Sequence, residues 1–288
     1  NFRDEFKDKV IDYFVNEYVQ ARTPNPCIAC NRYVKWESLL ERSMMLGADY
    51  IATGHYARIE KLENGRYALR TSKTSAKDQT YALYNLTQEQ LSRTLMPVGD
   101  YEKDEIREIA KKFNLRVANK PDSQEICFVS DNDYSSFVES EIGKKMPVGN
   151  FVTADGEILG KHKGILHYTI GQRKGLGIAL GHPIFVTEIR PETNEVVIGK
   201  NEDVFGYSLE ANNLNAMAVE KFFDGMRAVG KIRYSHKGEH CTIKVLGEDR
   251  IRIDFDEKVR AITPGQAVVL YDESGLVLGG GTIIKRCD

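Results

Sequence analysis

Apolar side chains in the first part of the chain recur three and four positions apart, the spacing that gives a helix one apolar face. One such segment covers residues 2–18, and a second covers residues 33–46 and ends at Gly47. Residues 48–54 form a short, mainly apolar segment, which predicts a buried strand followed by a turn. The first fifty residues therefore predict two helices followed by a strand.

Two more helices are predicted over residues 86–91 and 101–113, so helix and strand alternate up to about residue 129. This order is typical of an α/β domain with a parallel sheet. Beyond residue 146, period-two runs with Gly and Asn turns replace the helical spacing, and short strands of this kind favour small barrels. A polar break near residues 200–203 divides this β half.

Composition and charge limit the class of protein. The 288 residues are 41% hydrophobic and 28% charged, as in an ordinary globular protein of about two domains. Lys and Arg number 40 against 42 Asp and Glu, so no global positive field indicates a nucleic-acid partner. Residues 162–177 and 231–237 are locally basic and carry tyrosine, but charge runs of this kind are usually solvated surface.

No apolar run approaches the ~18 residues that cross a bilayer. The first ten residues alternate charges instead of forming the apolar core of a signal peptide. We therefore expect a soluble, cytoplasmic protein in a reducing compartment. In that setting the CxxC pair of Cys27 and Cys30 points to metal or redox chemistry.

Cys27 and Cys30 follow the segment Pro24–Pro26 and precede the second predicted helix. Because a helix N-terminus favours a thiolate, we expect the pKa of Cys30 to be lowered and its sulfur to be nucleophilic. A structural zinc site is the alternative. It needs two more ligands, and the sequence contains no second CxxC.

Cys127 lies between a polar loop and an apolar segment, where a lone cysteine is usually a small buried hydrophobe. Close to Cys30 in space, it would instead be a resolving, persulfide-carrying cysteine or a third ligand of an iron–sulfur cluster. The sequence leaves both possibilities open. Cys241 and Cys287 lack polar neighbours and are not site candidates.

Gly54 and His55 lie at the carboxyl end of the predicted strand, where open α/β sheets bind ligands and where glycine lets a nucleotide approach the backbone. An ordinary strand-to-loop turn fits these two residues equally well. Lys77, Asp78 and Gln79 precede an apolar run and by themselves indicate only a capped loop.

The chain contains six motifs, which are TPNPCIACN (23–31), ATGHYAR (52–58), KDQTYAL (77–83), PDSQEICF (121–128), YTIGQRKGLGI (168–178) and TPGQ (263–266). Taken together and in this order, they resemble those of the bacterial and organellar tRNA-specific 2-thiouridylases. Members of this family use ATP and Mg²⁺ to adenylate C2 of the wobble uridine 34 of tRNA and then replace its oxygen with sulfur.

The resemblance implies a partial PP-loop domain over residues 1–133, which is a Rossmann-like α/β domain of the ATP pyrophosphatase type. A central β-rich domain over 134–203 and a C-terminal β-barrel over 204–288 would follow. It also implies that Cys30 is the catalytic nucleophile and that Cys127 carries a persulfide received from a sulfur-relay protein or a cysteine desulfurase. The other matching positions are Gly54 for ATP, Asn25, Pro26 and Cys27 for the target base, and His55, Lys77, Asp78, Gln79, Arg233, Tyr234 and Gln266 for tRNA.

The sequence departs from the family pattern in two places. The ATP-cleaving SGGxDS motif does not occur in it, so we expect the chain to start inside the catalytic domain and to be inactive alone. Cys27 occupies a position where the best-known members carry Asp. Three thiols could instead hold a [4Fe–4S] cluster, as in related cluster-dependent tRNA thiolases, with Cys27, Cys30 and Cys127 as ligands. A non-catalytic RNA-binding fragment and a structural zinc protein are the alternatives from other classes.

Overall fold

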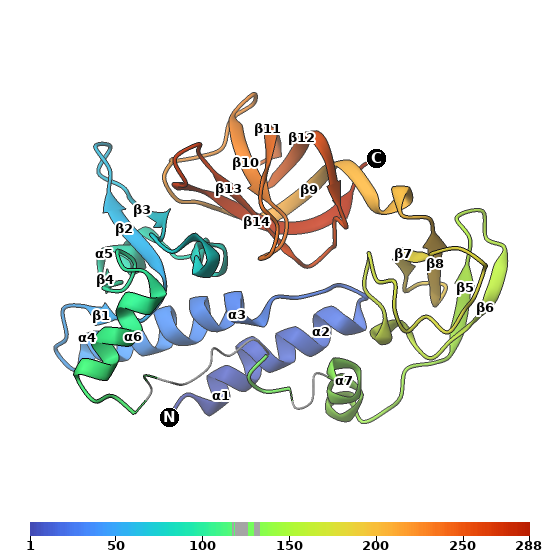
Figure 1. The fold of residues 1–288 in the computed structure, drawn as a ribbon, viewed down its shortest axis with the longest axis horizontal. Coiled ribbons are helices and arrows are strands. Elements are labelled where there is room, and N and C mark those ends of the chain that lie inside the picture. Colours follow the sequence, from blue (N-terminus) through green and yellow to red (C-terminus); the bar gives the residue numbers. More distant parts are fainter. Residues whose placement is uncertain (117, 119–125, 130–132) are drawn as a thin grey trace.

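The computed structural model describes residues 1–116, 118, 126–129 and 133–288. Two long helices run beneath a β-barrel, a hairpin lies at one end of the molecule, and a smaller sheet lies at the other end (Figure 1). Residues 121–125 of the PDSQEICF motif lie outside the described residues. Within the described part of the chain, no helix combines the length and the apolar composition needed to cross a membrane.

The first helix confirms the prediction for residues 2–18. It is continuous and consists of α1 (Arg3–Phe6), a wider π-helical segment (Lys7–Asp12) and α2 (Tyr13–Val19). Its apolar face buries Phe14 completely, against rings that include Phe128 and Phe137. This face therefore fixes the neighbourhood of residue 127 in space.

The second helix starts at Pro26. The spacing of apolar positions predicts a start at residue 33, which is wrong. Its parts are α3 (Pro26–Ala29), a π-helical segment (Cys30–Leu39) and α4 (Leu40–Met45). The Asn25 side chain accepts hydrogen bonds from the backbone N–H groups of the second and third helical residues. Proline suits the first helical position because its missing N–H would have no partner there. Both start signals lie in the polar TPNPC segment, where an apolar pattern cannot find them.

The parallel sheet of the first domain has two strands in the described part of the chain, β1 (Ile51–Ala52) and β4 (Thr94–Leu95). Strand β1 is shorter than the strand predicted over residues 48–54. It is followed by a hairpin that the pattern does not predict. This hairpin pairs β2 (Ala57–Lys61) with β3 (Tyr67–Thr71), and the Asn-Gly pair at its turn is the signal that could have found it.

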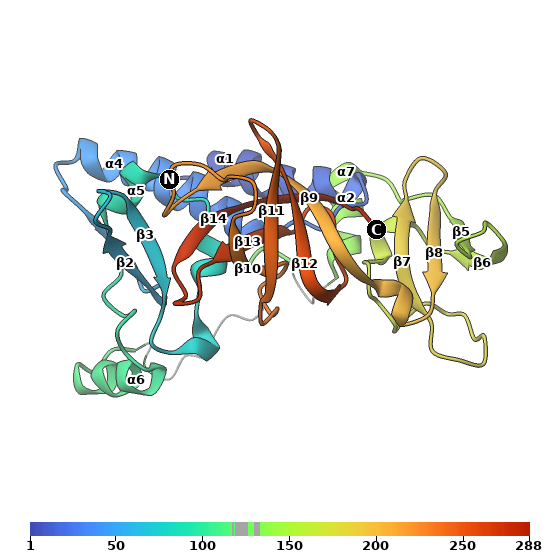
Figure 2. The same ribbon diagram turned by 90° about the horizontal axis from the view of Figure 1, so that it is seen from above.

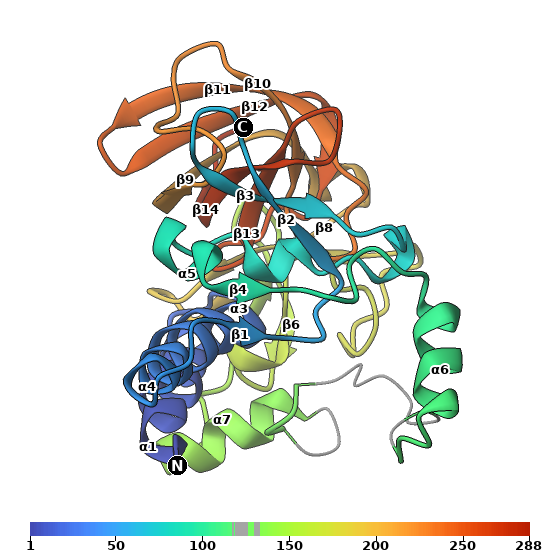
Figure 3. The same cartoon turned by 90° about the vertical axis from the view of Figure 1, so that its left-hand side faces the viewer.

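The helices predicted over residues 86–91 and 101–113 lie close to α5 (Gln88–Ser92) and α6 (Lys103–Lys112). The pattern does not predict the 3₁₀ turns Ser75–Lys77 and Thr80–Leu83 or helix α7 (Tyr134–Ile142). Helix α6 has no buried residue and lies at the edge of the molecule (Figure 3).

The β half contains two separate units. The middle sheet has the order β6-β5-β8-β7, with β5 (Gly149–Val152), β6 (Ile158–His162), β7 (Phe185–Arg190) and β8 (Glu195–Gly199). The second unit is a closed barrel of β9 (Phe205–Ala216), β10 (Arg227–Lys231), β11 (Glu239–Gly247), β12 (Arg250–Arg260), β13 (Ala267–Tyr271) and β14 (Val277–Arg286). A 3₁₀ turn (Glu202–Val204) connects the two units at the predicted polar break. Seen from above, the barrel lies between the hairpin and the middle sheet (Figure 2).

The barrel shares a hydrophobic core with the first domain. Leu69, Tyr81 and Leu83 belong to the same buried cluster as the barrel residues Val268 and Val269. The Tyr81 hydroxyl donates to the carbonyl of Ala267 over 2.8 Å. Since one core covers both units, the barrel helps to position the first domain.

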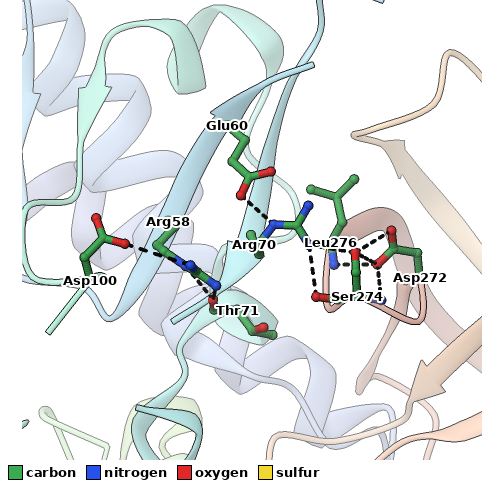
Figure 4. A network of polar contacts seen from close by, with 8 residues as sticks. All are labelled: Arg58, Glu60, Arg70, Thr71, Asp100, Asp272, Ser274 and Leu276. Atoms are coloured by element: carbon green, nitrogen blue, oxygen red, sulfur yellow. Dashed lines mark hydrogen bonds and ion pairs between the residues drawn. The ribbon is translucent and has the colours of Figure 1, made fainter. Parts of the chain in front are cut away.

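A polar network fastens the hairpin to the barrel (Figure 4). The Arg70 guanidinium donates to the backbone oxygen and the hydroxyl of Ser274, at 3.0 and 2.6 Å. Asp272 fixes that barrel turn by accepting from the backbone N–H groups of Ser274 and Leu276. Arg58 on the neighbouring strand donates to the Thr71 carbonyl. The hairpin is therefore bonded directly to a barrel turn.

Candidate functional site

The two cysteines of the CxxC pair lie on one exposed face of the second helix, called the thiol helix (residues 26–45) below. Cys27 is exposed and Cys30 is half-buried, and they are three residues apart, so they share that face. Asn31, beside them, is buried and donates its amide to the carbonyl of Ala82 over 2.9 Å. This bond ties the thiol helix to the segment that follows Gln79.

The expected lowering of the Cys30 pKa is wrong. Burial raises the pKa of Cys30, the nearby Cys127 and Cys27 raise it further, and only Lys35 lowers it. Because the helix begins at Pro26, the backbone N–H of Cys30 already donates to the Pro26 carbonyl. Cys30 therefore lies beyond the free N–H groups of the first turn, which would favour a thiolate.

The pKa of Cys27 is raised as well. Its main cause is again burial of one side of the thiol, with a contribution from Cys127 and an opposing one from Lys35. Each of the three cysteines thus lies within the electrostatic field of another. The structure brings together the thiols that the sequence singled out, although residue 127 is far from the other two along the chain.

Cys127 is exposed, whereas a lone cysteine in its sequence context would more often be buried. The residues beside it explain the difference. Ile126 and Phe128 pack on the cluster around Phe14, and the ring of Phe128 lies 5.3 Å from that of Phe14. With both neighbours anchored, the thiol between them points to solvent. All five cysteines are free.

The three thiols do not form a metal site in this structure. Within residues 1–116, 118, 126–129 and 133–288, no three His, Cys, Asp or Glu side chains are arranged to hold a metal ion. A [4Fe–4S] cluster or a zinc ion on Cys27, Cys30 and Cys127 would require these side chains to move.

His55 faces the thiol helix from the end of β1. Its Nδ1 lies 3.0 Å from the Thr53 hydroxyl, its Nε2 lies 3.5 Å from Lys35 Nζ, and its ring lies 5.3 Å from that of Trp36. Burial and the Lys35 charge lower the pKa of His55 to about 4. The imidazole is therefore neutral at pH 7 and can meet an RNA group only by hydrogen bonding or stacking.

Gly54 precedes His55 and is exposed, and a Cβ added there would meet no atom within 4 Å. The backbone is therefore open to a ligand at this position, which is what an ATP contact requires. The ATP assignment itself stays a prediction.

Asp78 and Gln79 are occupied by bonds that hold their own loop. Asp78 accepts from the backbone N–H of Ser72 and from the Thr80 hydroxyl. The Gln79 side chain accepts from the Tyr56 N–H over 2.9 Å, and its backbone N–H donates to the Tyr56 carbonyl. The loop that begins at Lys77 is thus held next to Tyr56, and its contacts with tRNA stay a prediction.

The barrel residues assigned to tRNA lie against the same region. The exposed ring of Tyr234 lies 6.3 Å from that of Tyr81. Arg233 donates to the Arg260 carbonyl over 2.6 Å, and burial with the charge of Arg260 lowers its pKa. Gln266 contacts the TPNPC segment, since its amide donates to the carbonyl of Thr23 over 2.9 Å. Two of the three are therefore also structural.

The two basic segments contribute less charge than their composition suggests. His162 is buried in the middle sheet, where burial lowers its pKa. Burial and Arg233 lower the pKa of His236 to about 4. Both imidazoles are neutral at pH 7, so phosphate binding here would depend on Lys and Arg.

Lys35 is the residue of the site that the sequence analysis missed. Its ammonium donates to Asn31 Oδ1 over 2.9 Å and is the one charge that lowers the pKa of both cysteines on the helix. The available signal was helical spacing, because residues 27, 31 and 35 follow one another four apart. The contact with His55 had no signal in the sequence.

Three family models match the chain in succession. They are a tRNA methyl transferase HUP domain over residues 1–131, a tRNA methyl transferase PRC-barrel domain over residues 135–200 and an aminomethyltransferase beta-barrel domain over residues 208–283. With the closed six-strand barrel, they confirm the predicted fold class of an α/β domain followed by two β units.

The chain is also similar to curated proteins over nearly its whole length. The tRNA-specific 2-thiouridylase MnmA of Lachnoclostridium phytofermentans is 67% identical over 285 residues, which are 99% of this chain and 80% of that protein. The MnmA protein of Clostridioides difficile is 57% identical over 99% of this chain and 79% of its own length. That of Clostridium perfringens is 55% identical over 98% of this chain and 78% of its own length.

Proposed function

This chain belongs to the tRNA-specific 2-thiouridylase family, and we propose that it replaces the C2 oxygen of the wobble uridine 34 of tRNA with sulfur. ATP, bound with Mg²⁺ and contacting Gly54, would transfer AMP to that oxygen and release pyrophosphate. Adenylation turns a poor leaving group into a good one. We further propose that the uridine is flipped out of the anticodon stack and lies beside Asn25, Pro26 and Cys27.

The observation that carries this proposal is the grouping of three thiols beside one cation. Cys30 lies within the field of Cys127 and Cys27, and the Lys35 ammonium opposes the cost of charging it. A reactive cysteine and a resolving cysteine need this proximity. The exposed position of Cys127 additionally allows another protein to deliver sulfur to it.

The proposed sulfur transfer takes place in three steps. The terminal sulfur of a persulfide on Cys127 attacks C2 of the adenylated uridine, a C–S bond forms, and AMP leaves with the electron pair of the C2–O bond. The Cys30 thiolate then attacks the Cys127 Sγ, which breaks the S–S bond and leaves the second sulfur on C2 as 2-thiouridine. The resulting Cys30–Cys127 disulfide is transient, and a cellular dithiol reduces it before the next turnover.

The partners follow from these steps. The persulfide donor is a sulfur-relay protein or a cysteine desulfurase. The tRNA would lie over His55, the loop Lys77–Gln79 and the barrel residues Arg233, Tyr234 and Gln266. Since its proposed substrate is tRNA, we expect the protein to work in the cytoplasm.

Thiolation in a strain that lacks its own 2-thiouridylase tests the proposal. The full-length protein restores 2-thiouridine in digested tRNA measured by mass spectrometry, and Cys30→Ser and Cys127→Ser each abolish it. Cys287→Ser, away from the site, is the matched control and leaves it unchanged. Persistent 2-thiouridine with Cys30→Ser would overturn the mechanism. Wild-type protein that binds tRNA without thiolating it would support the RNA-binding alternative.

Metal analysis separates the relay from the cluster alternative. We expect the protein purified without oxygen to contain no stoichiometric iron or acid-labile sulfide, because its thiols are not arranged as metal ligands. About four irons per chain, lost with Cys27→Ser, would instead establish the [4Fe–4S] cluster.

A further inference from the structure

Lys35 lies at the centre of a polar cluster formed by Asn31, Lys35 and His55. Its Nζ lies 2.9 Å from Asn31 Oδ1 and 3.5 Å from His55 Nε2. Asn31 is buried, and its amide N–H groups are directed to the Ala82 carbonyl, which turns its oxygen toward Lys35. The ammonium is therefore held in a defined place.

The position of Lys35 selects one tautomer of His55. An ammonium group can only donate hydrogen bonds, so a bond at Nε2 requires a lone pair there. The ring proton then lies on Nδ1 and donates to the Thr53 hydroxyl, which is 3.0 Å away. Burial and the Lys35 charge together keep the imidazole neutral. Lys35 makes Nε2 the acceptor.

The same charge reaches the thiols. Lys35 lowers the pKa of Cys27 and of Cys30, whereas burial and the neighbouring thiols raise both values. Within the ranges that the structure describes, no carboxylate forms an ion pair with Lys35. A half-buried ammonium that no described carboxylate pairs with is available to an anion formed at the thiols.

We propose that Lys35 is a positioning residue that stabilises anionic sulfur at Cys30 and holds His55 as a neutral hydrogen-bond acceptor. The inference rests on the proposed function for its role in sulfur transfer, where Cys30 must act as a thiolate. An anchoring role alone would not need Lys35, because Asn31 already connects the thiol helix to Ala82 without it.

The first test measures the pH profile of Cys30 alkylation by iodoacetamide, followed by peptide mass spectrometry on the full-length protein. Lys35→Met is expected to slow the reaction at pH 7.5 about tenfold and to move its midpoint to higher pH. Lys35→Arg keeps the charge and restores most of the rate. Lys35→Gln keeps a hydrogen-bond donor for Asn31 but no charge, so it behaves like Lys35→Met. Lys244→Met, at an exposed barrel position, is the matched control.

The second test follows the His55 ring by NMR as the pH changes. Without the Lys35 charge, the pKa of His55 moves up from about 4 toward its ordinary value of 6.5. An unchanged His55 titration and an unchanged alkylation profile in both folded uncharged variants would overturn the inference. Neither readout requires thiolation, so failure of the proposed function would appear separately, as 2-thiouridine that persists with Cys30→Ser.

Discussion

The side-chain amide of Gln266 donates to the carbonyl oxygen of Thr23 over 2.9 Å, and thereby joins the barrel to the segment that leads into the thiol helix. The backbone N–H of Thr23 adds a bond to the carbonyl of Pro264, also at 2.9 Å. The barrel thus fixes the entrance of the thiol helix although it contributes no thiol to the site.

Gln266→Leu removes the donor to the Thr23 carbonyl. We expect it to lower the free energy of unfolding by about 1 kcal/mol, because the part-buried carbonyl loses its partner. It should also reduce thiolation, since the segment before Cys30 is no longer held. Urea unfolding and 2-thiouridine content measure the two effects. Gln20→Leu, at an exposed position, serves as the control, and equal losses in both variants would contradict the expectation.

Asn25→Ala removes the side-chain cap of the thiol helix, which accepts from the backbone N–H groups of Cys27 and Ile28 at 3.2 and 3.4 Å. The expected cost is about 1 kcal/mol of unfolding free energy. Asn25→Asp keeps an acceptor and should recover most of it. If the Asp variant is as unstable as the Ala variant in urea unfolding, the cap does not stabilise this helix.

The pKa of His55 is about 4 in the folded protein and 6.5 in its ordinary state. The free energy of unfolding therefore depends on pH between these two values. In this range the unfolded chain binds a proton that the folded chain does not bind, so stability falls as the pH falls. At pH 5 this proton uptake by the unfolded chain lowers the free energy of unfolding by about 2 kcal/mol. His55→Gln removes it, and the stability difference between pH 7 and pH 5 should shrink by that amount. An equal difference in the variant and the wild type would exclude this linkage.

His236 provides an independent second case, because burial and Arg233 lower its pKa to about 4 as well. His236→Gln should reduce the same pH dependence. The double variant with His55→Gln should show the sum of the two effects, since the residues lie in different units. Chemical unfolding at pH 7 and pH 5 measures all three variants, and a non-additive result would mean that the two histidines are coupled.

The order in which the cysteines are alkylated should follow the exposure of their side chains. Cys127 and Cys27 are exposed, whereas Cys241 is fully buried and burial raises its pKa to about 12. Iodoacetamide is therefore expected to label Cys127 and Cys27 in the native protein and Cys241 only after unfolding. Early labelling of Cys241, seen by peptide mass spectrometry, would mean that the barrel opens in the native state.

The elements that could be predicted from the sequence are those with a strong local pattern. Helix α6 and the barrel strands β11, β12, β13 and β14 follow directly from period and turn residues. The start of the thiol helix could not be found from its apolar positions, because Asn25 and Pro26 act through backbone hydrogen bonding.

The electrostatics of the site lay beyond the sequence for a different reason. The thiolate expectation for Cys30 depended on where the helix begins and on how much water reaches the sulfur, and neither is a local property. The pairing of Lys35 with His55 joins residues 20 positions apart through tertiary packing. Motif resemblance located the cysteines and His55, but only the structure indicated which charge lies among them.

The bond between Tyr81 and Ala267 spans 186 residues of sequence. A core of such high contact order closes late, because its long loops must be brought together before the contacts form. During synthesis, the ribosome will have translated most of the barrel before the first domain can complete its packing. A chain shortened at its carboxyl end should therefore keep every thiol of the site and still fail to mature into an active protein.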